Sequence, residues 1–156
     1  MPLYFAYGSN LDRVQMARRC PTSHPICRAE LPEHRLAFTG PSAKRGRGVA
    51  TVLRDRHNCT PGVLYALSTA DVRALDGYEG HPWAYRRVEL DVFMDDGRLA
   101  KAWTYIKRDT SPCPPGDGYF GIIRAAYTRL GFDVRDLKDA LHRCRDGRKL
   151  AICSKL

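Results

Sequence analysis

The chain begins with an uninterrupted apolar and aromatic run, from Leu3 to Tyr7, which predicts a strand buried on both faces. The run stops at Gly8-Ser9-Asn10, residue types that favour tight turns. Residues 11–19 are mostly polar and have helical character. A strand, a tight turn and a helix aim several backbone N–H groups at one point, which suits an anion or a developing oxyanion. The simpler interpretation is a turn in which Asn10 is the N-cap of the helix.

Short apolar segments alternate with polar ones in the next part of the chain. We predict four strands here, over residues 26–31, 34–38, 49–53 and 61–67. Pro32-Glu33 separates the first two strands, and the polar segment 54–60, which we interpret as a loop, separates the last two.

Residues 68–79 have the pattern of a capped helix. Ser68 is followed three residues later by Asp71, which predicts a helix start of the capping-box type. Gly77 and Gly80 predict that this helix ends near Glu79. Glu79 is therefore expected at a helix end, on or near the apolar side.

The second half of the chain predicts a hairpin followed by helices. Residues 86–94 and 99–106 alternate apolar and polar positions around Asp95-Asp96-Gly97, the strongest hairpin signal in the sequence. We predict helices over residues 119–130 and 134–145, which Gly131 and Gly147 would follow. The tail, residues 149–153, could add a last strand or pack down. The whole pattern predicts one α+β domain, over residues 1–156, with roughly six to eight strands.

Composition and charge limit the classes of partner. No apolar run approaches ~20 residues, so no membrane span is expected, and no signal peptide is visible after Met1-Pro2, so we expect a cytoplasmic protein. The 26 basic and 17 acidic side chains give a net charge of +9, which could draw small anions into a cleft or hold nucleic acid. The basic residues, among them Lys107-Arg108, are dispersed among acids without interleaved stacking aromatics. We therefore interpret the charge as non-specific and expect no nucleic-acid partner.

No cofactor motif is found. The six cysteines form no C-x-x-C pair and none has a zinc-ligand spacing with histidine. Neither G-x-G-x-x-G nor a P-loop occurs. We expect no metal, nucleotide or redox cofactor and no cysteine nucleophile.

Residues 4–11, Tyr4-Phe5-Ala6-Tyr7-Gly8-Ser9-Asn10-Leu11, resemble the signature that opens γ-glutamylcyclotransferases. The match extends to residues 48–52, 62–65 and 75–80, with Tyr85 shortly after. The resemblance implies a mixed or antiparallel β-barrel-like sheet with flanking helices. It also implies an enzyme that releases 5-oxoproline and a free amine from a γ-glutamyl amide, with Glu79 as the catalytic acid/base.

The same resemblance implies a substrate site. The residues expected to hold or line it are Tyr7, Gly8, Ser9, Asn10, Leu11, Tyr85, Tyr105 and Tyr119. The tyrosines could equally be ordinary core aromatics. The Y-G-S-N motif at residues 7–10 is similar to that of the branch of the family that acts on γ-glutamyl amino acids. The alternatives are a cyclotransferase that deprotects an antibiotic precursor and a domain that binds γ-glutamyl compounds without turnover.

The proposed chemistry can be argued from the reaction itself. The α-amine of a γ-glutamyl group attacks its own γ-carbonyl, so the protein must fold the substrate, move protons and stabilise an oxyanion. One carboxyl can move the protons if burial raises its pKa, and Tyr78, Trp83 and Tyr85 are the expected aromatic neighbours of Glu79. The N–H groups of residues 8–10 would receive the substrate α-carboxylate or the oxyanion. The expected partner is a small γ-glutamyl compound; the oligomeric state is not determined, and a homodimer is one option.

Overall fold

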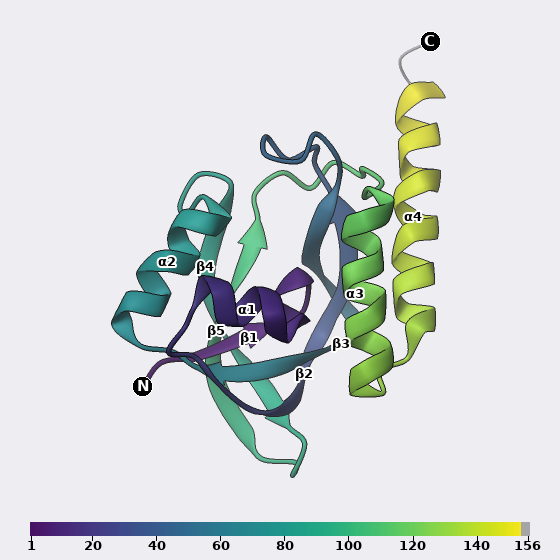
Figure 1. The fold of residues 1–156 in the computed structure, drawn as a ribbon. Coiled ribbons are helices and arrows are strands. Elements are labelled where there is room, and N and C mark those ends of the chain that lie inside the picture. Colours follow the sequence, from purple (N-terminus) through teal and green to yellow (C-terminus); the bar gives the residue numbers. More distant parts are fainter. Residues whose placement is uncertain (154–156) are drawn as a thin grey trace.

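The computed structural model describes residues 1–153, with side chains described up to residue 147, and its strands close into a barrel flanked by helices (Figure 1). The elements in chain order are β1 (Leu3–Ala6), the 3-10 helix η1 (Ser9–Leu11), α1 (Arg13–Arg19), β2 (His24–Thr39), β3 (Val49–Ala66), α2 (Thr69–Glu79), β4 (Tyr85–Met94), β5 (Leu99–Lys107), α3 (Asp117–Leu130) and α4 (Val134–Cys153).

The barrel has the strand order β1-β3-β2-β4-β5 and closes between β5 and β1. All neighbouring strands are antiparallel except β1 and β5, which run parallel with Tyr4 opposite Trp103. The sheet is therefore mixed, and the expected α+β class with a barrel-like sheet and flanking helices is confirmed.

The strands β2 and β3 are longer than the sequence pattern indicates. The predicted breaks at Pro32-Glu33 and at residues 54–60 are wrong, because both segments lie inside continuous strands. Glu33 takes a positive φ of 57°, and the register jumps there from Pro32 opposite Cys59 to His34 opposite Arg54. The irregularity is absorbed as a bulge in the β2–β3 ladder. This merging leaves five strands in the described residues instead of six to eight.

The helix α2 has the predicted boundaries. The Ser68 hydroxyl accepts a hydrogen bond from the Asp71 N–H while the Asp71 carboxylate accepts one from the Ser68 N–H, which completes a capping box. Gly80 then adopts a left-handed conformation with φ 64° and ends the helix. Glu79 is therefore the last helical residue, as predicted.

The hairpin of β4 and β5 and the start of the C-terminal helices also agree with the sequence pattern. Gly97 has φ 84° in the predicted turn, and Gly131 has φ 73° after α3. The predicted end of α4 near Arg145 is wrong, as is the alternative of a last strand, because α4 continues to Cys153. Gly147 lies within the helix at a close approach, where an added Cβ would lie 2.9 Å from Cγ of Pro112.

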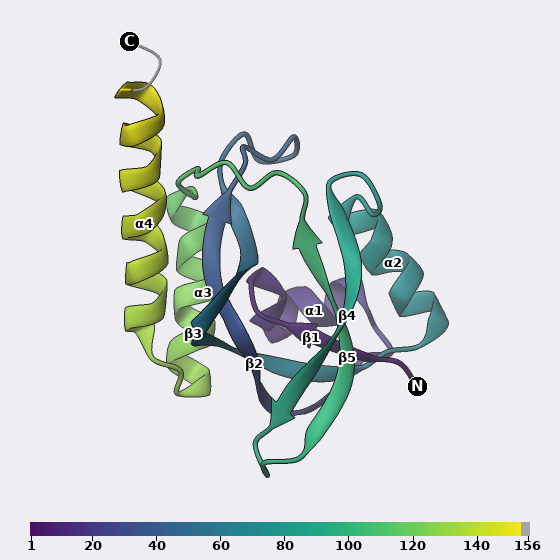
Figure 2. The ribbon, with the colours of Figure 1, turned by 180° about the vertical axis from the view of Figure 1, so that it is seen from behind.

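The helices lie on two sides of the barrel. The helices α3 and α4 lie side by side on one flank, and α2 lies on the opposite flank (Figures 1 and 2). Fully buried side chains of Phe5, Leu64, Leu75 and Ile123 belong to one core that joins the barrel to α2 and α3. Among the described residues, no helix is long and apolar enough to cross a membrane.

Candidate active site

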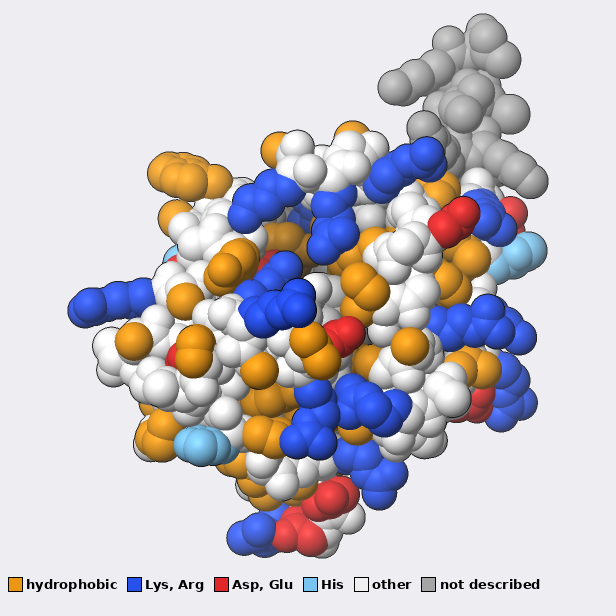
Figure 3. Space-filling view, viewed as in Figure 1, with side chains coloured by type: hydrophobic (Ala, Val, Ile, Leu, Met, Phe, Trp, Pro, Cys, Tyr) orange, Lys and Arg blue, Asp and Glu red, His pale blue; other side chains and the backbone are white. Residues whose placement is uncertain are grey.

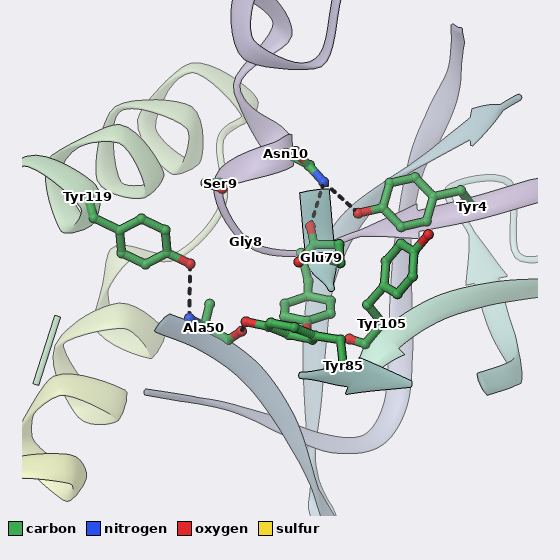
Figure 4. Close-up of a pocket in the computed structure, with 10 residues that line it drawn as sticks. Tyr4, Gly8, Ser9, Asn10, Ala50, Glu79, Tyr85, Tyr105 and Tyr119 are labelled. Atoms are coloured by element: carbon green, nitrogen blue, oxygen red, sulfur yellow. Dashed lines mark hydrogen bonds between the residues drawn. The ribbon is translucent and has the colours of Figure 1, made fainter. Parts of the chain in front are cut away.

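A cavity of about 40 Å³ lies where the turn after β1 faces the end of α2 (Figure 4). Its lining residues are Tyr4, Tyr7, Gly8, Ser9, Asn10, Ala50, Glu79, Tyr85, Tyr105 and Tyr119. The structure thus brings together eight of the nine residues expected from the sequence. Leu11 is the exception: its side chain is only 1% exposed within the core, and its carbonyl accepts a hydrogen bond from Nη2 of Arg129 at 2.8 Å.

The turn leaves its own N–H groups free. The carbonyls of Gly8 and Ser9 accept hydrogen bonds from the N–H groups of Leu11 and Asp12, both at 3.0 Å. Within the described part of the chain, no protein acceptor takes the N–H groups of Gly8, Ser9 or Asn10. These donors are therefore available to an anion at the cavity.

Asn10 is not the N-cap of α1, which corrects the simpler interpretation of the turn. Asp12 is the N-cap, and its carboxylate accepts from the N–H groups of the first helical turn. The Asn10 side chain is instead almost completely buried, and its Nδ2 donates to Tyr4 Oη at 2.9 Å and to Glu79 Oε1 at 3.3 Å. Its Oδ1 accepts from Gln15 Nε2 at 3.2 Å and Arg19 Nη1 at 3.0 Å. These four contacts fix the amide so that a donor faces Glu79.

Glu79 is half-buried in the wall of the cavity. Burial raises the pKa of Glu79, and the charges of Arg19 and Lys44, the Asn10 hydrogen bond and the charge of Arg45 only partly oppose this rise. The expectation that Trp83 would help to bury Glu79 is wrong, because the Trp83 side chain is 85% exposed. Tyr78 is also half-exposed and lies outside the inner cavity.

Tyrosines from four different elements form most of the wall. Tyr7 Oη donates to the carbonyl of Tyr105 at 2.5 Å, and Tyr105 Oη donates to Asp76 Oδ1 at 2.6 Å. Tyr85 Oη donates to the Ala50 carbonyl at 2.9 Å, while the Ala50 N–H donates to Tyr119 Oη, also at 2.9 Å. Each of these hydroxyls thus has a partner in the protein.

Burial keeps the tyrosines neutral. It is the main cause that raises the pKa of Tyr4, Tyr7, Tyr85 and Tyr105, and it raises the pKa of Tyr119 to about 12. At neutral pH, Glu79 is therefore the acidic group of the cavity that can exchange a proton.

Three contributors were not among the expected site residues. Tyr4 and Ala50 line the cavity. Asp76 accepts the hydrogen bond of the Tyr105 hydroxyl and also forms an ion pair with Arg87, with 3.4 Å between Asp76 Oδ1 and Arg87 Nε. Tyr4 and Ala50 lie within the segments that carry the family resemblance, so that signal could have found them. Among the described residues, no group of three or more His, Cys, Asp or Glu side chains is placed to hold a metal ion.

The sequence model of the family described as "Gamma-glutamyl cyclotransferase, AIG2-like" matches residues 4–120. The chain belongs to this family. Every residue of the inner cavity lies within the matched segment, whereas α4 lies outside it.

Similar proteins carry the same family name. The chain is 29% identical over 126 residues to the human protein named gamma-glutamylcyclotransferase. The aligned residues cover 78% of this chain and 67% of the human protein. The mouse protein of the same name is 28% identical over the same shares. A solved structure described as gamma-glutamyl cyclotransferase superposes with a TM-score of 0.81 at 25% identity, covering 89% of this chain and 85% of that one.

Proposed function

We propose that this protein is a γ-glutamylcyclotransferase that releases 5-oxoproline and a free amine from a γ-glutamyl amide, with Glu79 as acid/base. The observation that carries the proposal is the half-buried Glu79 carboxyl, which accepts a hydrogen bond from Asn10 in a cavity shared with the turn of residues 8–10. Family membership and the names of the relatives support the same reaction.

The reaction needs a base that can also act as an acid. Glu79 takes a proton from the substrate α-ammonium, and the freed amine attacks the γ-carbonyl carbon, so that a C–N bond forms and a five-membered lactam closes. The bond between that carbon and the leaving nitrogen then breaks. The two protons lost by the α-nitrogen end on the leaving nitrogen, and Glu79 is restored as a carboxylate. The raised pKa of Glu79 brings it closer to the operating pH, where a proton-transfer group is most effective.

The other residues of the cavity have binding roles in this proposal. The free N–H groups of Gly8, Ser9 and Asn10 receive either the substrate α-carboxylate or the oxyanion. The tyrosine wall, whose hydroxyls are already bonded, holds the glutamyl chain in the curled conformation that ring closure requires. Leu11 supports the turn from the core.

The test replaces the acid/base without changing its shape. We expect Glu79→Gln to lower 5-oxoproline release from γ-glutamyl amino acids by about 10²–10⁴-fold, since the amide cannot accept and return a proton. Glu89→Gln, an exposed glutamate on β4, is the matched control and should retain full turnover. A folded Glu79→Gln protein that turns over at the wild-type rate would remove the proposal.

The proposal also includes the sequence-based expectations of a cytoplasmic place of action and of one domain over residues 1–156. Cell fractionation would test the first, and limited proteolysis followed by mass spectrometry would test the second.

A further inference from the structure

A larger outer cavity opens directly from the inner one. It has a volume of about 620 Å³ and shares Ser9, Glu79, Tyr85 and Tyr119 with the inner cavity. Figure 3 shows Lys and Arg side chains gathered around a hollow in this face of the molecule. Glu79 lies at the junction, so a substrate whose α-amine reaches Glu79 at the inner cavity extends its leaving group into the outer one.

The outer cavity is strongly cationic. Among the described residues, its lining contains the four basic residues Arg19, Lys44, Arg45 and Lys107 and the one acidic residue Glu79. Among the described residues, none of these four cations forms an ion pair with a carboxylate. Arg19 and Lys44 donate to neutral oxygens of Asn10 and of the end of α2, and the Arg45 guanidinium lies 4.5 Å from the centre of the Tyr119 ring. Glu79 can offset one of these four positive charges, so the cavity keeps a net positive charge.

Lys107 is the most unusual of the four. The residue is only 6% exposed, and among the described residues its ammonium forms no ion pair. It lies opposite Tyr85 in the β4–β5 ladder, with Nζ 5.8 Å from the Tyr85 ring centre, and its backbone N–H donates to Thr51 Oγ1 at 3.0 Å. Its Nζ is not among the fully buried polar atoms that lack a hydrogen-bond partner, so the ammonium keeps access to the cavity that it lines. The strand therefore holds a positive charge at the cavity that an anionic ligand group would satisfy.

A second lysine on the same strand provides the contrast. Lys101 is exposed and its ammonium donates to Asp91 Oδ1 at 2.9 Å across the β4–β5 ladder. Lys101 thus has the acid partner that Lys107 lacks, although Lys107 is the more buried of the two.

We infer that the outer cavity is a leaving-group subsite selective for acidic amines, such as an acidic amino acid or a short acidic peptide, and that Lys107 determines this specificity. The inference rests on the proposed function and narrows its substrate class. A leaving group with two or more carboxylates can reach Lys107 and also the more exposed Arg45 or Lys44. A polycationic amine, such as an aminoglycoside, is repelled by the same charges.

The experiment compares three substrates whose leaving groups carry two, one and no carboxylates. These are γ-glutamyl-glutamate, γ-glutamyl-alanine and γ-glutamyl-methylamide, each followed by 5-oxoproline release. We expect kcat/KM to decrease in that order, with the first exceeding the last by about 10-fold to 100-fold, the range of one charge-assisted hydrogen bond. Lys107→Met should reduce the ratio between these two substrates by about 10-fold, whereas the matched control Lys101→Met should leave it unchanged.

The outcomes separate this inference from the proposed function. If all three substrates release 5-oxoproline with similar kcat/KM, the inference is overturned and the cyclotransferase remains. An equal loss on all three substrates in Lys107→Met also overturns it, and release from none of them overturns both. If Lys107→Met does not fold, the double variant Lys44→Gln, Arg45→Gln, whose two side chains are at the surface, takes its place with the same expected fall in the ratio, and an unchanged ratio there overturns the inference.

Discussion

The inner and outer cavities meet at Glu79 but differ in whether the protein itself supplies partners for the polar side chains that line them. In the inner cavity the tyrosine hydroxyls are bonded to main-chain groups, to Asn10 or to Asp76. In the outer cavity four cations face the space without a carboxylate partner among the described residues. The inner wall is therefore fixed by the fold itself and suits the positioning of one constant chemical group. The outer wall keeps its charges for a ligand and suits selection among variable groups.

After Glu79 itself, the contact that links the inner wall to this carboxyl should give the largest effect. Asn10→Ala removes the donor at 3.3 Å from Glu79 Oε1, and we expect kcat/KM to fall by about 10-fold to 100-fold, as for loss of a hydrogen bond to a charged group. Since Glu79 must be ionised to accept a proton, kcat/KM falls as pH decreases through its pKa, which burial has raised. The Asn10 bond opposes that rise, so its removal should move the acid limb of the pH–rate profile to higher pH.

The control for this change is Asn58→Ala, because Asn58 binds Asp55 on β3, outside both cavities. Its profile should coincide with that of the wild type. An acid limb that stays in place in a folded Asn10→Ala protein would show that Asn10 does not act on Glu79.

The tyrosines of the inner wall should matter for stability. Tyr85→Phe leaves the Ala50 carbonyl without its partner, and Tyr119→Phe does the same for the Ala50 N–H. Because Ala50 is buried, we expect each change to lower the free energy of unfolding by about 1–3 kcal/mol, measured by urea denaturation. Unchanged stability in both variants would contradict a wall held by these bonds.

A third tyrosine, away from the cavities, should show the smallest effect. Tyr127 on α3 is fully buried against Phe132, and its hydroxyl has no hydrogen-bond partner among the described residues. Tyr127→Phe removes an unsatisfied polar group and keeps the ring, so we expect the free energy of unfolding to stay the same or rise by up to about 1 kcal/mol. If Tyr127→Phe lowers the free energy of unfolding as much as Tyr119→Phe in the same urea titration, the hydrogen bonds to Ala50 do not explain the stability of the inner wall.

Local signals predicted the elements whose ends are fixed by local chemistry. The capping box at Ser68 and the left-handed Gly80 set both ends of α2, and thereby the position of Glu79, within a dozen residues of chain. Gly97 in the β4–β5 turn is a similar case. These features depend on neighbours in sequence, which is why a single sequence reveals them.

Tertiary packing decided the elements that the sequence pattern did not predict. Pro32-Glu33 reads as a break, but pairing along the whole β2–β3 ladder absorbs it as a bulge. Gly147 reads as a helix stop, but it is the point where α4 passes close to Pro112. In both cases the residue type signals a local irregularity, and only the distant partner determines whether the element ends there.

The site shows the same division. The family resemblance named most of the inner cavity, although Leu11 turns to the core and Trp83 lies exposed. Lys107 appeared only as one of many dispersed basic residues. Its distinctive property, burial without an acid partner, depends on its register opposite Tyr85 and cannot be recognised from spacing along the chain.

Ala50 contributes to the cavity wall through its peptide groups, which two hydroxyls from α3 and β4 bind from either side. Mutational scanning that truncates side chains to alanine therefore records nothing at this position, although three distant segments converge on it. Any survey of this enzyme by side-chain replacement will underestimate how much of its pocket is built from main chain. Replacing the Ala50 amide by an ester removes the N–H that binds Tyr119 and so tests this contribution directly.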